Sequence, residues 1–414
     1  MRHTWFALVL SLAVPVPALA QLPQNDVCPR AVAVPGSGPF PFSASVTTTG
    51  ATEETTDPPV ICNYKGVPAM KSVWFNFTPD ASAVYQIDTL GSTPANDYDT
   101  IIGLYTGACG NLVPLANGCA DDSTGSLQSI LTLALEGGKT YTIVVSGLGI
   151  RDAFDPANSL PSNGGELKLN VKRVSVSYPY RYMIPSVAKA PGAGDSSFVS
   201  DVTVANVDKD DGFLFFQFLG HGKFRDENPP ANQPVSTPVS LAAGGARDFP
   251  DILGGLNVSN DYGALLIQSS RKLFAGSRTY TPSAGGGSFG QYTQAVDLST
   301  ELLTVGEVGR FISVREDDRF RTNLAFFNTA SVQCVIRVEV HDSLGNPFDS
   351  GTRLPVLPPN TMVQISGLKE YFGFSADVVN ATVVVSVQTP CAVGGAAYVI
   401  DRVTNDPYAV SLRK

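Results

Sequence analysis

The chain has 414 residues and a formal net charge of −9, and only 16% of its residues are charged. This length corresponds to roughly three domains of a hundred-odd residues. A hydrophobic fraction of 43%, with 39 glycines and 30 prolines, favours turn-rich β domains over helical ones, whose surfaces need many Lys and Glu residues. The basic residues are scattered and form no patch, which argues against nucleic acid or an anionic membrane surface as a partner.

Residues 1–20 have the features of a secretory signal peptide. A basic start precedes an apolar run and small residues at Ala18 and Ala20, so we expect cleavage before Gln21. The alternative, a membrane anchor, is disfavoured because two prolines interrupt a run that is short for a membrane span, and no later segment is long enough to insert. Without Arg2 the mature chain has 27 basic and 37 acidic residues, a charge of 27 − 37 = −10. We expect a secreted or cell-surface protein, with the periplasm as an alternative location.

Residues 21–176 carry the strand patterns of a first domain. Between Lys71 and Val145, apolar residues alternate with polar ones, and Gly, Pro, Asn and Asp clusters separate the runs. Trp74 is flanked by apolar residues in one such run, so we expect it in the core rather than on a sugar-binding surface.

The ordered motifs of this region resemble the bacterial pre-peptidase C-terminal domain in its cysteine-containing form. They include NDVC (25–28), GATEETTDPPVIC (50–62), SVWFNFTP (72–79), DTIIGLYTGACGNL (99–112) and GGELKLNV (164–171). The resemblance implies a small β-sandwich of jelly-roll or CUB-like type in an exported protein, often beside a protease or other hydrolase and without catalysis of its own. Substrate contact, secretion and calcium-dependent stability are the roles that it implies.

After a linker near residues 175–182, the chain repeats itself. Segment 196–220 returns as 318–345, and segment 261–280 returns as 379–399. The matched residues are Phe198 with Phe320, Asp201 with Asn323, Asn206 with Asn328, Gly276 with Gly394, and Tyr280 with Tyr398. The repeat predicts two tandem domains, 177–300 and 301–414, which resemble immunoglobulin-like modules of bacterial exported proteins.

The predicted fold is therefore all-β, with three β-sandwich domains. One short helix is expected over residues 366–373, where Ser366 would cap its start and Gly373 would end it.

All six cysteines follow the signal peptide, and an even number in an oxidising compartment predicts disulfides. Six cysteines allow 15 connectivities. We expect neighbours in sequence to pair, because each pair then stays inside one domain. A zinc site is disfavoured because close CxxC pairs and His companions are missing. The expected pairs are Cys28–Cys62, Cys109–Cys119 and Cys334–Cys391.

The sequence offers little for catalysis. His221 and His341 are the only histidines after residue 20, and their related positions in the two repeats favour a structural role. Ser196 lies in GDSS (194–197), which lacks the context of known serine hydrolases and predicts a polar turn. HExxH, GxSxG and phosphate-binding loops are missing, and adjacent Asp121 and Asp122 would point to opposite sides of an extended segment, unlike a glycosidase pair. We expect no enzyme activity.

Four aspartates of the first domain are candidate calcium ligands: Asp26, Asp99, Asp121 and Asp122. Carboxylates on loops at one end of a sandwich would suit Ca²⁺, which takes six to eight oxygen ligands in irregular geometry. The alternative is turn formation, since Asp hydrogen-bonds its own backbone in tight turns.

Aromatic residues are the remaining candidates for recognition. Tyr178, Tyr180 and Tyr182 share one face of the linker, where they are either exposed or packed at the junction of the first two domains, and we favour packing. Tyr280, Tyr398 and the run FLFFQF (213–218) are expected in the sandwich cores.

These features predict a secreted, non-catalytic binding or adhesion protein that recognises an extracellular glycan or protein, with calcium as a candidate stabilising ion. The alternative is an accessory, non-catalytic portion of a secreted protease or hydrolase system. Ligand identity and oligomeric state stay open.

Overall fold

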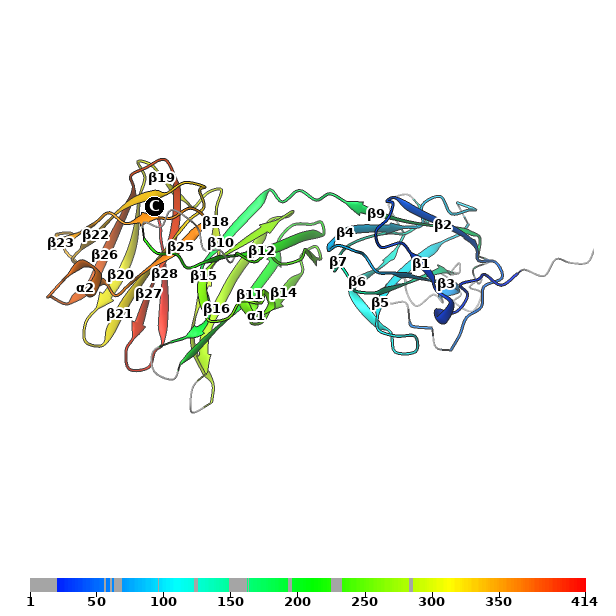
Figure 1. The fold of residues 1–414 in the computed structure, drawn as a ribbon, viewed down its shortest axis with the longest axis horizontal. Coiled ribbons are helices and arrows are strands. Elements are labelled where there is room, and N and C mark those ends of the chain that lie inside the picture. Colours follow the sequence, from blue (N-terminus) through cyan, green and yellow to red (C-terminus); the bar gives the residue numbers. More distant parts are fainter. Residues whose placement is uncertain are drawn as a thin grey trace, which may run out of the picture. The chain divides into compact units, whose positions relative to one another are not determined.

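The computed structural model describes residues 21–55, 57–59, 62, 69–95, 97–122, 126–148, 162, 164–192, 196–224, 233–282 and 286–414. The expected signal peptide lies outside these residues. The chain forms two compact units, and the boundary between them in the sequence lies between Val174 and Ser175. Both are built almost wholly from β-strands, so the prediction of an all-β chain of β-sandwiches is confirmed (Figure 1).

The N-terminal unit is a sandwich of two sheets. One sheet has the strand order β1-β3-β8-β5-β6, and the other has the order β2-β9-β4-β7. A 3-10 turn, η1 (Cys28–Arg30), precedes the first strand. The strands are β1 (Val32–Val34), β2 (Phe42–Thr47), β3 (Ala69–Phe77), β4 (Ala83–Asp88), β5 (Thr100–Thr106), β6 (Val113–Asp121), β7 (Ile130–Leu135), β8 (Tyr141–Leu148) and β9 (Glu166–Val174).

Strand β3 is buried on both faces. Phe77 faces the second sheet and packs edge to face against Tyr85, with ring centroids 5.1 Å apart. Trp74 points to the opposite face, where it is only 1% exposed and lies among Tyr105, Val144 and the segment that carries Cys28. The N-terminal segment thus covers the outer face of the sheet, and Trp74 is a core residue, as predicted.

The first repeat occupies the start of the C-terminal unit. Its nine-stranded sheet runs β13-β12-β15-β10-β11-β16-β17, with β14 beside β11 and β18 beside β10. Strands β10 and β11 pair only through Ala190 and Pro191, so the sheet folds over there into two layers around one core. The elements are β10 (Tyr180–Pro191), β11 (Ser197–Asn206), β12 (Gly212–Gly220), β13 (Val239–Leu241), β14 (Ala246–Phe249), α1 (Ile252–Gly255), β15 (Asp261–Ser269), β16 (Leu273–Pro282), β17 (Ser288–Gln294) and β18 (Val296–Asp297).

The second repeat follows with the same order of pairings. Its sheets are β19-β27-β21-β25, with β28 beside β27, and β20-β26-β22-β23, with β24 beside β22. Thus β11–β16–β17 recurs as β21–β27–β28, and β10–β15–β12 recurs as β20–β26–β22. The elements are β19 (Leu303–Thr304), β20 (Val308–Glu316), β21 (Phe320–Asn328), β22 (Cys334–His341), β23 (Pro347–Arg353), β24 (Val356–Leu357), β25 (Thr361–Ser366), α2 (Leu368–Phe372), β26 (Val378–Val387), β27 (Ala392–Asp401) and β28 (Pro407–Ser411).

The strand register corrects part of the predicted residue matching. Asn206 faces Leu273 and Asn328 faces Val393, so these positions correspond across the repeats. Counting along the strands from there, Gly276 corresponds to Ala396 rather than Gly394, and Tyr280 corresponds to Ile400 rather than Tyr398. The sequence match had therefore slipped by two residues, which keeps every side chain on its face and so leaves the alternation intact.

The two repeats pack against each other through a shared apolar core. One face of β21 and β27 covers the outer face of β10, β12 and β15. Backbone contacts add to this junction, since the Gly222 amide donates to the carbonyl of Met362 at 2.8 Å. Core residues of the junction are Met183, Leu219, Ala264 and Leu266 from the first repeat, and Ala325, Phe327, Met362, Ala396 and Tyr398 from the second.

All six cysteines form disulfides, but two of the expected pairs are wrong. The structure joins Cys28 to Cys109 and Cys62 to Cys119, and only Cys334–Cys391 matches the prediction. Cys109 precedes β6 and Cys119 lies near its end, and each is bonded to a cysteine of an earlier segment. The two bridges instead attach the segments that carry Cys28 and Cys62 to the β5–β6 hairpin. Pairing cysteines that are neighbours in sequence does not predict such bridges.

The predicted short helix is present as α2, and Gly373 ends it in the left-handed conformation, as expected. The expected cap is wrong, because Gly367 holds the N-cap position and no side chain at that position makes a capping bond. The carboxylate of Glu316 accepts from the Leu368 amide instead.

Candidate functional site

Three of the four predicted calcium ligands meet at one end of the N-terminal sandwich. Asp99 directly precedes β5, Asp121 ends β6, and Asp122 follows it. Because Ile101 faces Asp121 in the β5–β6 pair, the two strand ends lie side by side. One carboxylate oxygen from each residue lies within 4.8 Å of the others.

The acidic group is electrostatically strained. Burial raises the pKa of Asp99 to about 7, and the neighbouring charges of Asp122 and Asp121 add to this effect. Its Oδ1 atom is buried and has no hydrogen-bond partner among the described residues. A cation would relieve the repulsion and supply the missing partner of that oxygen, so these three residues fit a hard ion such as Ca²⁺.

A hydrogen bond and a disulfide hold the strand ends that carry the three aspartates in place. The Leu148 amide donates to the carbonyl oxygen of Asp99 at 2.9 Å, which ties the start of β5 to the end of β8. Ile101 and Leu148 form a small apolar cluster against the Cys62–Cys119 disulfide. Cys119 is two residues from Asp121, so the bridge fixes the strand that carries two of the carboxylates.

Asp26 lies outside this group. Its two carboxylate oxygens accept hydrogen bonds of 2.7 Å from the backbone amide and the hydroxyl of Thr52. The neighbouring Asn25 pairs with the backbone of Trp74 through both its side-chain amide and its carbonyl. NDVC therefore clamps the N-terminal segment to the sheet, and this is a structural use of Asp26 rather than a shared cation site.

A second charged group, in the second repeat, was missed by sequence reasoning. It surrounds a pocket of about 450 Å³ whose lining includes Glu316, Arg321, Lys369 and Arg402. Glu316 is only 2% exposed, and its oxygens accept from the amides of Leu368 and Thr322 and from Arg402 at 3.4 Å. Its members come from β20, β21, α2 and the loop after β27, so no local motif signals it.

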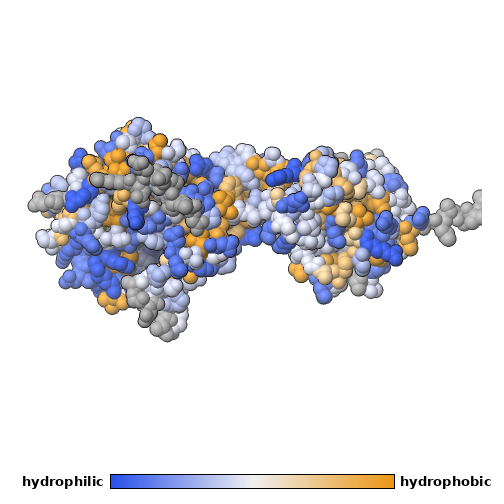
Figure 2. Space-filling model, in the orientation of Figure 1, coloured by the Kyte–Doolittle hydropathy of each residue, from blue (hydrophilic) through white to orange (hydrophobic). Residues whose placement is uncertain are grey.

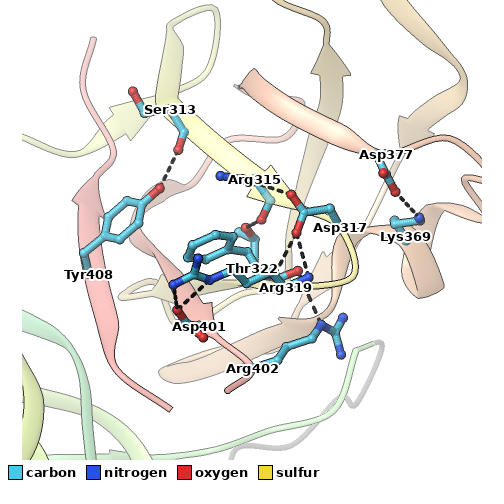
Figure 3. Close-up of polar contacts among 11 residues, drawn as sticks. Ser313, Arg315, Asp317, Arg319, Thr322, Lys369, Asp377, Asp401, Arg402 and Tyr408 are labelled. Carbon is cyan, nitrogen blue, oxygen red and sulfur yellow. Dashed lines mark hydrogen bonds and ion pairs between the residues drawn. The ribbon is translucent and has the colours of Figure 1, made fainter. Parts of the chain in front are cut away.

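Most charges around this pocket are already paired (Figure 3). Arg315 pairs with Asp317, and Arg319 contacts Asp401 at 3.0 Å. Lys369 contacts Asp377 at 2.8 Å. Hydrogen bonds from the Val403 amide and Arg319 lower the pKa of Asp401. These ion pairs hold the loops around the pocket in place.

The residues considered for catalysis have structural surroundings. The backbone carbonyl of Ser196 accepts from the Gly192 amide at 2.8 Å and closes the β10–β11 turn. His221 stacks on Tyr262 with ring centroids 4.5 Å apart, and burial lowers its pKa. His341 ends β22, as expected from the repeat.

The linker tyrosines pack onto the first repeat. Tyr178 meets Phe215 edge to face at 4.9 Å, and Tyr180 packs against the core of the repeat. The Tyr182 hydroxyl accepts from the Leu273 amide at 3.1 Å. These three rings are therefore not a free recognition surface.

An exposed aromatic face lies on β16 and β17. Phe274 is 66% exposed and Tyr292 is 63% exposed. Tyr292 faces Arg278 across the strand pair, and its hydroxyl lies over Gly276, where a Cβ atom would be only 2.0 Å from it. Tyr280, which we expected in the core, belongs to this outer face and is half-buried beneath the guanidinium of Arg278, 4.8 Å from its ring centroid.

No protein-family model matches the chain, and no curated protein matches it significantly. The resemblance of residues 21–176 to the pre-peptidase C-terminal domain stays a prediction, and the function has to be argued from the residues themselves.

Proposed function

We propose that this chain is a secreted, non-catalytic binding or adhesion protein that recognises an extracellular glycan, or else a protein, through the outer face of β16 and β17. Three disulfides among the described residues support an extracellular location. None of the helices in the described part of the chain has the length and apolar character needed to cross a membrane. We also propose that the N-terminal unit is a domain of the pre-peptidase C-terminal type.

One observation carries the binding proposal. The face of β16 in the first repeat is equivalent to the face of β27 in the second, with Arg278 at the position of Tyr398. In the second repeat this face is covered by the first repeat. In the first repeat it is open and carries Phe274 and Tyr292. The fold therefore already uses this face once for docking, and its second copy is exposed and aromatic.

The chemistry of the face favours a glycan. Gly276 leaves room for the Tyr292 ring to lie across the sheet, and Phe274 follows two residues earlier on the same face. Flat exposed rings stack on the C–H faces of sugar rings, because such contacts bury apolar surface on both sides. Arg278, Thr203 and Asp248 supply neighbouring donors and acceptors for hydroxyl groups.

Exposed hydrophobic residues also occur away from β16 and β17. On the face drawn in Figure 2, hydrophobic residues lie in separate patches between hydrophilic ones. Single exposed apolar residues of this kind, such as Leu344 and Val403, are normal on a soluble surface and serve as controls.

We assign a supporting role to calcium at Asp99, Asp121 and Asp122. The ion would offset their repulsion and stabilise the strand ends of the N-terminal unit. Asp26 has no part in this proposal, because Thr52 already occupies its carboxylate.

The test is co-sedimentation of residues 21–414 with insoluble cellulose and chitin, and separately capture on collagen. We expect retention on a polysaccharide, and at least about tenfold weaker retention for Phe274→Ala/Tyr292→Ala. The control variant Leu344→Ala/Val403→Ala removes two exposed apolar residues of the second repeat and should bind like the parent. Retention on collagen alone would assign a protein ligand to the same face.

The proposal is contradicted if the parent protein is retained on none of these materials, or if the aromatic variant binds as well as the parent. Turnover of casein, gelatin or ester substrates by the purified protein would contradict the non-catalytic assignment.

A further inference from the structure

The contact between the two repeats is apolar at one end of β21 and polar at the other. Side chains at alternate positions of a strand share a face, so Phe327, Ala325, Asn323 and Arg321 follow one another along the junction. Phe327 and Ala325 belong to the shared apolar core. Asn323 and Arg321 instead line a pocket of about 220 Å³, where the apolar contact between the repeats ends.

Arg321 carries a half-buried positive charge. Among the described residues its guanidinium makes no hydrogen bond and no ion pair, in contrast to Arg315, Arg319 and Arg402. The nearest carboxylate, Glu316, already accepts from Thr322, Leu368 and Arg402. Burial and the positive charge of Arg402 lower the pKa of Arg321. The attraction of Glu316 acts against these two effects, but no hydrogen bond from a described residue offsets the desolvation of the guanidinium.

Most of the exposed surface of the pocket is apolar, although the side chains of Ser186, Thr279, Asn323 and Asn405 also line it. Phe198 and Tyr262 contribute aromatic walls from the first repeat, and Gln364 contributes an amide from the second. Gln291, on β17, also lines the pocket, and its buried Oε1 has no hydrogen-bond partner among the described residues. The pocket therefore offers one cation, one acceptor that needs a donor, and an apolar surface between them.

We propose that this pocket binds a small carboxylate with an apolar body, in the form of the carboxyl-terminal residue of a peptide. The carboxylate would pair with Arg321, whose planar guanidinium matches a carboxylate bidentately. The side chain would lie against Phe198 and Tyr262, and the peptide N–H would donate to Gln291. Capture of chain ends by such groups is a recurring mode of peptide recognition.

The size of the pocket supports a short segment. Drug-sized ligands occupy about 300–1,000 Å³, so a pocket of 220 Å³ suits one terminal residue rather than a longer chain. An acidic sugar carries a carboxylate too, but its many hydroxyl groups would face mainly apolar walls and lose hydrogen bonds on entry.

This inference goes beyond the proposed function and does not depend on it. Gln291 and Tyr292 are adjacent on β17 and point to opposite faces, so the pocket and the exposed aromatic face are separate surfaces. The variants that test one leave the other intact.

The test is isothermal titration of residues 21–414 with N-acetyl-L-leucine, N-acetyl-L-leucine amide and sodium glucuronate. We expect N-acetyl-L-leucine to bind with a dissociation constant of about millimolar order, as befits a ligand of this size. The amide, which lacks the charge, and glucuronate, which lacks the apolar side chain, should bind at least about tenfold more weakly.

Two variants locate the site. Arg321→Gln should weaken N-acetyl-L-leucine binding at least about tenfold, while Arg310→Gln, the same change at an exposed position of β20, should leave it unchanged. Because Arg321 makes no hydrogen bond or ion pair with the described residues, the unliganded Arg321→Gln protein should melt at the same temperature as the parent or higher.

The inference is overturned if N-acetyl-L-leucine fails to bind at about 10 mM, if the amide binds equally well, or if Arg321→Gln binds like the parent. Binding of glucuronate alone would overturn the peptide assignment in favour of an acidic sugar. A lower melting temperature of Arg321→Gln would show that Arg321 serves the fold instead.

Discussion

Two buried asparagines occupy the same place in the two repeats. Asn206 Nδ2 donates to the carbonyls of Asp210, Leu241 and Ala242, and Asn328 Nδ2 donates to those of Val332, Leu357 and Pro358. In each repeat the side-chain oxygen accepts from the amide two residues later. Each amide thus ties the end of a central strand to two loops.

Removal of either asparagine should therefore lower the free energy of unfolding by a similar amount. We expect Asn206→Ala and Asn328→Ala each to lower the free energy of unfolding by about 2–4 kcal/mol, because several backbone carbonyls lose a donor at once. Urea denaturation measures this, with Gln388→Ala, an exposed amide, as a control that should change stability by less than about 0.5 kcal/mol. A loss in one repeat only would show that the two sites are not equivalent.

Asp99 makes the stability of the N-terminal unit depend on pH. Its carboxyl keeps its proton to about pH 7 in the folded state, whereas the unfolded chain releases it near pH 3.8. The folded state binds more protons between these values, so without calcium the stability contributed here falls as the pH rises from about 4 to 7.

Thermal melting across this pH range in EDTA checks the prediction. Asp99→Asn should remove the downward slope and should raise the melting temperature above pH 7, since it removes a buried, repelled charge. Asp97→Asn, an exposed neighbour, should leave the slope in place. An unchanged slope in Asp99→Asn would contradict the assignment.

At the scale of single elements, the N-terminal segment acts as a cover for β3. It carries Cys28, which the disulfide to Cys109 fastens across 81 residues of sequence, and it shields Trp74. From Gln21 onward, Trp74 is the only tryptophan in the chain, so its fluorescence reports on this cover alone.

Opening the bridge with Cys28→Ser/Cys109→Ser should destabilise the N-terminal unit by about 2–5 kcal/mol and shift tryptophan emission to longer wavelength as Trp74 meets water. The matched variant Cys334→Ser/Cys391→Ser opens a bridge in the other unit and should leave the emission of the folded protein unchanged. Peptide mapping without reduction gives an independent check, since a peptide pair joining Cys28 to Cys62 would contradict the observed connectivity.

Local patterns predicted the elements well, and contacts distant in sequence account for most of what they missed. Alternation found the strands, and Gly373 marked the end of α2, because both signals act over a few residues. The cap of α2 comes from Glu316, 52 residues away from Leu368, and no local signal reveals it. The two wrong disulfides failed for the same reason, since folding brings together segments that a proximity rule keeps apart.

Of the candidate sites, one could be predicted from the sequence and one could not. Asp99, Asp121 and Asp122 were selected because carboxylates on loops at one end of a sandwich would suit a cation, and the β5–β6 pairing brings these three together. The pocket of Arg321 could not be predicted, because it forms only where the two repeats pack together. The sequence pattern of one repeat does not show how that repeat packs on the other. Tyr280 was expected in a core, but it lies on the face of β16 that stays open in the first repeat, whereas the equivalent face of β27 is covered in the second.

At the scale of the whole molecule, the chain consists of two compact units that hold different candidate sites. The N-terminal unit holds the candidate cation site, and the C-terminal unit holds both the exposed aromatic face and the pocket between the repeats. The repeats share an apolar core that includes Met183, Phe327 and Tyr398, so neither can unfold without exposing that core to water. We therefore expect them to unfold together, although each has its own sandwich core.

Differential scanning calorimetry of residues 21–414, with EDTA or with calcium, tests this division most directly. We predict two transitions, one for each unit, and calcium should raise the melting temperature of the N-terminal transition alone, because an ion that binds only the folded unit stabilises it. Asp99→Asn should remove that shift. A third transition would show that the two repeats melt separately and would contradict their joint unfolding. A calcium effect that is absent, or that falls on the C-terminal unit, would contradict the cation site in the N-terminal unit.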